Sequence, residues 1–246
     1  MSGAAEAQRP RVAALVLAAG RASRFGAAKL LERLDARTVI EHTLAAVRAS
    51  GPDRVLVVLP PGPDGDRLQE AIAPGGAGSV RNRAPERGLS SSVRLGLDVL
   101  ATDGTLDVVV VLPADQPLVR PETIRAAVDA AFADPDRPIG LVRHRLDGSP
   151  NPVALRRSAV EAARTSDALS GDRGLGPYLA AHPDLVSEVA VEGANPDVDT
   201  PADLLAARWA VRVRANRDQV DRVREIPDGV DFYAPVSRLF RDDPTR

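Results

Sequence analysis

Short runs of apolar residues, almost uninterrupted by polar ones, constrain the fold of this chain most strongly. Three such runs occupy residues 11–18 (RVAALVLA), 54–59 (RVLVVL) and 107–112 (DVVVVL). Strands that are covered on both faces carry runs of this kind, whereas half-exposed strands alternate apolar and polar residues. The runs therefore predict strands of a buried parallel sheet, with the most hydrophobic one, residues 107–112, near its centre.

Helical patterns lie between these runs. Apolar residues recur at helical spacing in residues 38–49, and Val93, Leu97 and Leu100 share one face of a helix predicted over residues 89–100. Strands that alternate with helices indicate a three-layer α/β sandwich around a mostly parallel, Rossmann-like sheet with right-handed crossovers. Further helices are predicted over residues 68–73, 121–132, 156–166 and 174–181 and from about residue 200, further strands over 138–142 and 185–191, and a loop over 74–78.

The length of 246 residues suits one α/β domain with an appendage, and we expect the domain to span residues 10–207. Residues 212–225 are crowded with charge and carry few apolar side chains. Phe232, Tyr233 and Phe240 then supply three of the chain's seven aromatic residues. We interpret residues 208–246 as a C-terminal extension. It is a junction between two domains, a docking segment for a protein partner, or a loosely packed tail.

Composition excludes several classes of function. Without cysteine the chain has no disulfide, no thiolate metal site and no cysteine nucleophile. A net charge of -2 provides no basic surface for nucleic acid. The first ten residues lack the pattern of a signal peptide, and no apolar run is long enough to span a membrane. We therefore expect a cytoplasmic protein that acts on small molecules.

A glycine-containing loop, residues 17–29 (LAAGRASRFGAAK), directly follows the first predicted strand. Ligands of open α/β sheets bind beyond the carboxyl ends of the strands, so this loop lies where a nucleotide would bind. The small residues at positions 18–20 let backbone N–H groups approach phosphate oxygens, and Arg24 and Lys29 supply positive charge for a triphosphate. The loop matches neither the P-loop nor the dinucleotide-binding pattern.

Two further segments carry candidate ligand-binding groups. Residues 86–93 (ERGLSSSV) open a predicted helix, where free N–H groups and hydroxyls hold a base edge or a phosphate, or where a serine simply caps the helix. Asp115 follows the most hydrophobic strand and would face the ligand crevice. Because Mg²⁺ prefers one or two carboxylates together with phosphate oxygens and water, Asp115 is the expected metal ligand.

The loop at residues 17–29 resembles the signature L-A-A-G-x-x-x-R-x-G-x-x-K of the MobA-like nucleotidyltransferases. That superfamily includes molybdenum cofactor cytidylyltransferases, guanylyltransferases, and sugar and erythritol nucleotidyltransferases. Segments similar to the family's other motifs follow in the family's order, at residues 39–44 (VIEHTL), 115–118 (DQPL), 148–155 (GSPNPVAL), 171–174 (GDRG) and 197–204 (DVDTPADL).

The resemblance implies the nucleotide-diphospho-sugar transferase type of fold and an Mg²⁺-dependent transfer of a nucleoside monophosphate, with release of pyrophosphate. Arg24, Lys29 and Asp115 would then be catalytic residues. Asp197 would reach the metal or the acceptor phosphate, unless its role is purely structural. The residues expected at the nucleotide are Leu17, Ala18, Ala19, Gly20, Arg24, Lys29, Gly88 and Ser92.

The finer specificity rests on less sequence. L-A-A-G, rather than the L-A-G-G of many guanylyltransferases, is most similar to the cytidylyltransferases, and implies CTP with a molybdopterin-type acceptor. Residues 35–37 (DAR) replace a usual glycine, a departure that lies outside the phosphate loop. Asn151 replaces a common histidine, which leaves the acceptor open. A sugar phosphate or another small phosphate is therefore an alternative acceptor. A different class of function is a non-catalytic nucleotide-binding partner in molybdoenzyme maturation, although retention of Arg24, Lys29 and Asp115 favours an enzyme.

Overall fold

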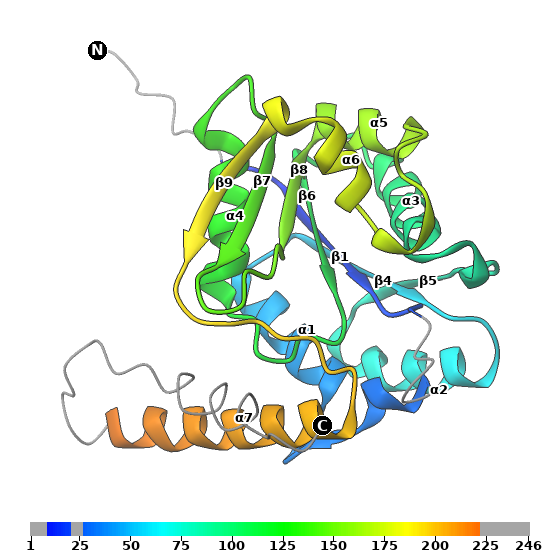
Figure 1. The fold of residues 1–246 in the computed structure, drawn as a ribbon. Coiled ribbons are helices and arrows are strands. Elements are labelled where there is room, and N and C mark those ends of the chain that lie inside the picture. The colour runs from blue at the N-terminus through cyan, green and yellow to red at the C-terminus, as the bar shows by residue number, and fades with distance from the viewer. Residues whose placement is uncertain (1–8, 21–26, 222–246) are drawn as a thin grey trace, which may run out of the picture.

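A seven-stranded sheet organises the computed structural model, which describes residues 9–20 and 27–221 (Figure 1). The strand order is β5-β4-β1-β6-β8-β7-β9, with β6 at the centre as expected. All neighbouring pairs are parallel except β6–β8 and β7–β8, so the predicted mostly parallel sheet is confirmed. The strands of this sheet are β1 (Val12–Leu17), β4 (Arg54–Leu59), β5 (Gly78–Arg81), β6 (Val108–Pro113), β7 (Ile139–His144), β8 (Val153–Arg156) and β9 (Val186–Val191).

Helices cover both faces of this sheet, which gives the predicted three layers (Figure 1). The helices are α1 (Val39–Ser50), α2 (Gly62–Ile72), α3 (Leu89–Ala101), α4 (Pro121–Ala133), α5 (Arg157–Thr165), α6 (Gly176–Ala181) and α7 (Pro201–Asp221). Short 3₁₀ helices include η1 (Ala27–Leu31), η3 (Pro85–Arg87) and η4 (Gly171–Arg173), and β2 (Arg33–Leu34) pairs with β3 (Arg37–Thr38) in a separate hairpin.

Alternate residues of the central strands feed two separate hydrophobic cores. Ala14 and Val16 of β1 pack into one core with side chains of α1, α2, α4 and α7. Ala13 and Leu15 point to the other face, toward α3, α5 and α6. Because β1 is buried on both faces, its sequence shows no polar alternation. The apolar run that predicted this strand is therefore a direct consequence of the layered architecture.

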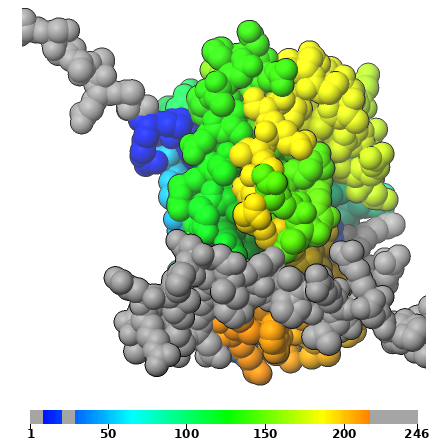
Figure 2. Space-filling model, turned by 60° about the vertical axis from the view of Figure 1, so that its left-hand side comes forward, coloured from blue at the N-terminus to red at the C-terminus, as the bar shows by residue number. Residues whose placement is uncertain are grey.

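Close approach of a helix to the sheet depends on one glycine. A Cβ added to Gly140 of β7 would lie 2.0 Å from the carbonyl oxygen of Ala127 in α4. No real side chain tolerates such a distance, so only glycine lets α4 lie this close to β7. In Figure 2, α4 in green and β9 in yellow lie side by side on the face that this packing produces.

Two strands of the large sheet and half of a helix were not predicted. The short edge strand β5 begins in the Gly-rich stretch, where the sequence indicates only a loop. Strand β8 returns antiparallel beside both β6 and β7, because the connection after β7 is too short for a crossover helix. Helix α2 begins at Gly62 rather than near residue 68, with a proline in its first turn, and its few apolar residues explain why the pattern missed its start.

Helix α7 continues without a break through the predicted boundary at residue 207. Ala207 and Ala210 are both buried, and the Arg212 guanidinium lies 2.6 Å from the carboxylate of Asp35. The start of the proposed extension is therefore one helix with the end of the domain. Its remainder, including Phe232, Tyr233 and Phe240, lies outside the described residues. Within the described part of the chain, no helix has the length and apolar character needed to cross a bilayer.

Truncation tests where the folded domain ends. A chain that ends after residue 221 is expected to melt at the same temperature as the full chain. A chain that ends after Arg208 loses the buried Ala210 and the exposed Arg212–Asp35 pair, so it should melt cooperatively a few degrees lower. Differential scanning calorimetry measures both. Loss of the cooperative transition on removal of residues 222–246 would assign those residues to the domain instead.

Candidate active site

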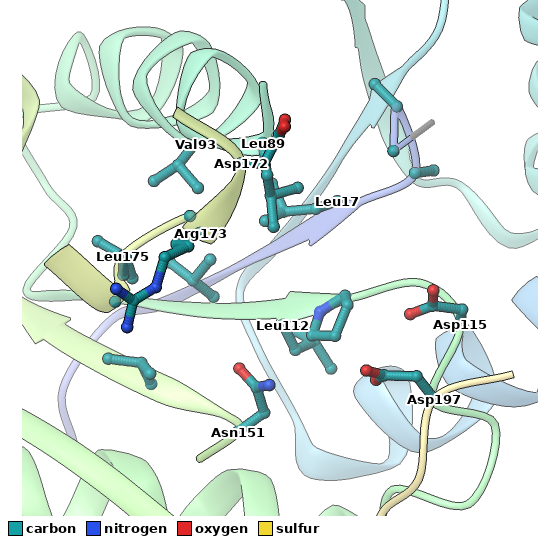
Figure 3. Close-up of a pocket in the computed structure, with 18 of the residues that line it drawn as sticks. Leu17, Leu89, Val93, Leu112, Asp115, Asn151, Asp172, Arg173, Leu175 and Asp197 are labelled. Carbon is teal, nitrogen blue, oxygen red and sulfur yellow. The ribbon is translucent and has the colours of Figure 1, made fainter. Parts of the chain in front are cut away.

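A cavity of about 700 Å³ opens at the carboxyl ends of β1 and β6 (Figure 3). This is the edge of the sheet where α/β folds bind ligands, and where the sequence analysis expects the nucleotide. Asp115 and Asp197 lie together at one end of the cavity, whereas Arg173 and Leu175 lie at the other (Figure 3). The walls are formed mainly by Leu17, Ala18, Ala19, Gly20, Lys29, Pro60, Pro85, Leu89, Val93, Val111, Leu112, Asp115, Asn151, Val153, Asp172, Arg173, Leu175, Leu179, Asp197 and Asp199.

The loop after β1 lines the cavity with small residues. Ala18 is tied to the sheet through its N–H, which donates to the carbonyl of Val58 at 2.9 Å. A Cβ added at Gly20 would meet no atom of the described residues within 4 Å, so packing does not require glycine there. The backbone at this position is open toward the cavity, as close approach of a phosphate would require. Arg24 lies outside the described residues, so its expected phosphate contact stays a prediction.

Lys29 forms hydrogen bonds with two carboxylates that line the cavity. Its Nζ donates to Asp115 Oδ2 at 2.7 Å and to Asp199 Oδ1 at 3.0 Å, and the residue is only 9% exposed. Burial by itself would lower the pKa of the Lys29 ammonium. The charge and hydrogen bond of Asp115, together with those of Asp199, more than offset burial and raise the pKa above its ordinary value. Lys29 is thus a permanent positive charge held in one place.

Asp115 and Asp197 form a close acidic pair. The backbone N–H of Val198 donates to the carbonyl of Asp115 at 2.9 Å, which anchors the Asp197 loop beside β6. Burial, and then the neighbouring Asp115 charge, raise the pKa of Asp197 to about 6. Asp115 Oδ1 is buried and accepts no hydrogen bond within the described part of the protein. Negative charge and an unsatisfied acceptor therefore accumulate at this end of the cavity.

The serine loop lies behind the cavity wall. Gly88 has φ +90°, and a Cβ added there would lie 2.5 Å from the carbonyl of Gly171, so the start of α3 packs directly on η4. Ser92 is 1% exposed and accepts a hydrogen bond from Asn82 Nδ2 at 2.9 Å. Neither Gly88 nor Ser92 lines the cavity in this structure. Their expected contact with the nucleotide stays a prediction.

The opposite end of the cavity has a different character. Leu89, Val93 and Leu175 form an apolar wall, and Arg173 extends beside it (Figure 3). Among the described residues, Arg173 makes no hydrogen bond or ion pair. Asn151, on the segment 148–155 that resembles a family motif, also lines the cavity, and its carbonyl lies 3.1 Å from His144 Nε2. A ligand that bridges both ends would meet carboxylates and Lys29 at one end and an apolar, cationic surface at the other.

Sequence reasoning missed two kinds of residue. Asp199 lies just before α7, where a carboxylate often caps a helix, but Asp203 accepts from the N–H groups of both Asp199 and Thr200 and takes that role. The carboxylate of Asp199 is free to pair with Lys29. Gln116 and Asn195 form buried hydrogen bonds beside Asp197 that no motif indicated. The only available signal was that Gln116 is polar and adjoins Asp115 in a proline-flanked turn.

Comparison with known proteins agrees with this geometry. The chain is similar to Bifunctional protein GlmU of Xanthobacter autotrophicus, with 34% identity over 186 residues, which are 68% of this chain and 39% of that protein. It is also similar to Phosphoenolpyruvate guanylyltransferase of Sphaerobacter thermophilus, with 30% identity over 190 residues, which are 74% of this chain and 83% of that protein. The chain thus spans less than half of the first of these relatives.

Solved structures share the fold of this chain. Rv0371c from Mycobacterium tuberculosis H37Rv superposes with a TM-score of 0.69 at 29% identity, over 81% of this chain and 98% of that chain. A complex of Rv0371c with manganese superposes with a TM-score of 0.67 at 26% identity, over the same shares of both chains.

The family match covers most of the chain that forms the sheet and the cavity. Residues 14–186 match the MobA-like NTP transferase domain. This range contains most of β1, the loop that follows it, Lys29, Asp115 and every other strand of the large sheet except β9, of which it includes only Val186. The fold, the placement of the cavity and this match agree, and the chain belongs to the MobA-like NTP transferase domain family of nucleotidyltransferases.

Proposed function

We propose that this protein transfers CMP from CTP to a phosphorylated acceptor such as the molybdopterin cofactor, with Mg²⁺ and with release of pyrophosphate. The observation that carries the proposal is one cavity in which a small-residue loop, a buried lysine and three aspartates converge. The cavity volume of about 700 Å³ suits a nucleotide together with a second small molecule. The chain's L-A-A-G loop supports CTP over GTP.

The acidic end of the cavity fits a hard divalent cation. Asp115 Oδ1 is buried without a partner among the described residues, and burial, together with the neighbouring Asp115 charge, raises the pKa of Asp197. No set of three or more His, Cys, Asp or Glu residues in the described ranges is arranged to hold a metal alone. This arrangement suits Mg²⁺, which keeps several waters and shares its ligands with substrate phosphates. Asp115 and Asp197 would hold the ion, which when bound would neutralise phosphate charge during transfer.

The protein's own residues perform binding and charge neutralisation. The acceptor phosphate oxygen attacks the α-phosphorus of the nucleotide, and the bond to the bridging oxygen breaks, so pyrophosphate leaves with the electron pair. This step asks for positioning rather than a covalent intermediate with the protein. The N–H groups of residues 18–20 would hold phosphate oxygens, and Lys29 and Arg24 would neutralise charge that develops on the α-phosphoryl and leaving groups.

A second candidate keeps the same chemistry with another acceptor. Phosphoenolpyruvate guanylyltransferase is matched over 83% of its own length, and the unpaired Arg173 would suit an acceptor that carries an additional negative charge. The acceptor would then be a small phosphorylated acid or a sugar phosphate instead of molybdopterin. Either choice of acceptor leaves the proposed roles of Lys29 and Asp115 unchanged.

The deciding experiment is a pyrophosphate-release assay. CTP, GTP, ATP and UTP are each tested with molybdopterin-bound molybdate, phosphoenolpyruvate and a sugar 1-phosphate in the presence of Mg²⁺. The proposal expects release with CTP and molybdopterin-bound molybdate. Release only with phosphoenolpyruvate or the sugar phosphate selects the second candidate. No release with any pair, despite nucleotide binding, supports a non-catalytic partner instead.

Nucleotide choice can also be measured without an acceptor. Because a ligand that binds only the folded state raises its melting temperature, CTP with Mg²⁺ is expected to stabilise the protein more than GTP, ATP or UTP. A thermal-shift titration at equal nucleotide concentrations gives the order. Omission of Mg²⁺ is the control, and it should reduce the shift for every nucleotide. A larger shift with GTP would place the enzyme with the guanylyltransferases.

A further inference from the structure

Two buried amides, Gln116 and Asn195, lie directly behind Asp197. We propose that they are positioning residues, which hold the carboxylate of Asp197 in the orientation needed to bind the divalent cation. This inference rests on the proposed function, in which Asp197 is a metal ligand. It adds a mechanism by which a loop carboxylate far from Asp115 in the sequence acquires a fixed geometry.

The hydrogen bonds run in one direction toward the carboxylate. Asn195 Nδ2 donates to Gln116 Oε1 at 2.8 Å, and Gln116 Nε2 donates to Asp197 Oδ1 at 2.8 Å. An amide has one donating and one accepting end, so the bond from Asn195 fixes which end of Gln116 faces Asp197. Reversal of the Gln116 amide would place its oxygen against the carboxylate. Asn195 therefore determines the orientation of Gln116, and Gln116 determines that of Asp197.

Only one carboxylate oxygen of Asp197 takes part in these hydrogen bonds. Oδ1 accepts from Gln116, whereas Oδ2 accepts no hydrogen bond from the residues that the structure describes. In Figure 3 the carboxylates of Asp197 and Asp115 project into the same part of the cavity. A carboxylate that is held through one oxygen and presents the other is the usual arrangement of a metal ligand supported by neighbouring hydrogen bonds.

Packing alone does not explain these residues. Gln116 is 1% exposed and Asn195 is fully buried. Burial of an amide costs free energy unless each of its polar atoms is hydrogen-bonded, and Asn195 Oδ1 has no partner among the described residues. Apolar side chains of similar size would fill the same space without that cost. Two adjacent buried amides, both aligned on a carboxylate, therefore indicate a role in orienting that carboxylate.

Asn195 is also attached to the segment that carries Asn151. The backbone N–H of Asn195 donates to Asp147 Oδ2 at 2.9 Å, and Asp147 Oδ1 accepts from the N–H of Ser149 at 3.0 Å. The turn at residues 147–151 is thereby held against the residue that orients Gln116. These bonds fix the backbone of Asn195. A fixed backbone is needed because Asn195 is the first donor in the series of hydrogen bonds from Asn195 to Gln116 to Asp197.

Two apolar replacements of similar size test the proposal. Gln116→Met removes the donor to Asp197, and Asn195→Leu removes the donor to Gln116. The direct readout is the dissociation constant of Mn²⁺, measured by electron paramagnetic resonance with a non-hydrolysable CTP analogue bound. Loss of a supporting hydrogen bond typically weakens metal affinity or activity about 10- to 100-fold. We expect a weakening of that size for Gln116→Met and a smaller one for Asn195→Leu.

A variant that carries both substitutions tests whether Asn195 and Gln116 affect Mn²⁺ binding together or independently. Because Asn195 acts only through Gln116, the double variant should bind Mn²⁺ no more weakly than Gln116→Met alone. In activity assays the concentration of Mg²⁺ needed for half-maximal rate should rise, with much smaller change in kcat at saturating Mg²⁺. A purely structural role would lower the melting temperature without this shift in metal dependence.

Controls make the outcome decisive. Thr123→Val, a buried polar-to-apolar change in α4, should leave Mn²⁺ affinity unaltered. Where Asn195→Leu does not fold, Asn195→Ala, which is uncharged and also lacks the Nδ2 donor, replaces it. Mn²⁺ affinity unchanged in Gln116→Met, or additive effects in the double variant, would overturn the proposal.

If Asp197→Ala weakens Mn²⁺ binding while Gln116→Met does not, only the positioning role fails. If Asp197→Ala has no effect, the metal role of Asp197 fails with it.

Discussion

Replacement of Asp115 by asparagine is expected to reduce kcat/KM for nucleotidyl transfer by at least about 10², the usual cost of removing one charge-stabilising contact. The asparagine amide would turn its oxygen toward Lys29, whose Nζ lies 2.7 Å from Asp115 Oδ2. Its NH₂ group would then occupy the place of Oδ1, the buried oxygen without a partner. A hydrogen-bond donor would thus point to the position where the cation is proposed to bind.

The fold should survive this change. Lys29 keeps its second partner, Asp199 Oδ1 at 3.0 Å, so no buried charge is left alone. Asp103→Asn is a matched control, because Asp103 lies before β6, at the opposite end of the strand from Asp115, and its Oδ1 accepts from the N–H of Thr105 at 3.1 Å. That variant should lose about 1 kcal/mol of stability with turnover retained. Pyrophosphate release and thermal melting of both variants give the comparison. More than about a tenth of the activity left in Asp115→Asn would exclude it as the metal ligand.

Local sequence patterns were sufficient for the buried strands and for most helices. β1, β4 and β6 are covered on both faces, so burial alone sets their composition. Strands β5 and β8 escaped prediction because neither carries such a pattern. β5 is a four-residue edge strand with an exposed start, and β8 depends on pairing with β6, whose residues precede it by more than forty positions. The position of a strand in the sheet is information that no short window of sequence contains.

The same distinction applies to the site. Lys29 and Asp115 were expected there because each follows a recognisable strand or motif, and both line the cavity. The contacts of Lys29 with Asp199 and of Gln116 with Asn195 join residues 170 and 79 positions apart. Propensity and periodicity describe neighbours along the chain, so they could not reveal these pairs. A carboxylate that precedes a helix, as Asp199 precedes α7, often caps it, but Asp203 and Thr200 already do so here.

Lys29 is the chain's single lysine among 32 basic residues. Its Nζ lies within 3.0 Å of two carboxylate oxygens, and its side chain is 11% exposed. A compact ammonium can serve both oxygens from one atom, whereas the planar guanidinium of arginine is larger and spreads its charge. The geometry of this position therefore favours lysine, in a protein that otherwise uses arginine for every basic side chain.

Lys29→Met is expected to reduce kcat/KM by about 10² or more, because the fixed charge that we propose to face the transferred phosphate is lost. Unlike removal of an exposed basic residue, it should also lower the melting temperature. Asp115, Asp199 and Asp197 would remain close together without the ammonium between them. Repulsion among like charges destabilises the folded state, and a bound cation should restore part of the loss.

The measurement is a pair of melting curves for each protein, one with a chelator and one with Mg²⁺. The gain in melting temperature from Mg²⁺ should be larger for Lys29→Met than for the unaltered protein. The turnover of Lys29→Met should nevertheless stay low when Mg²⁺ is present. Lys29→Arg should recover stability better than activity, because it restores charge but not the single-atom contact with both carboxylates. Full activity in Lys29→Arg would show that only the charge matters. An equal response of all three proteins to Mg²⁺ would show that Lys29 and the cation do not share the same carboxylates.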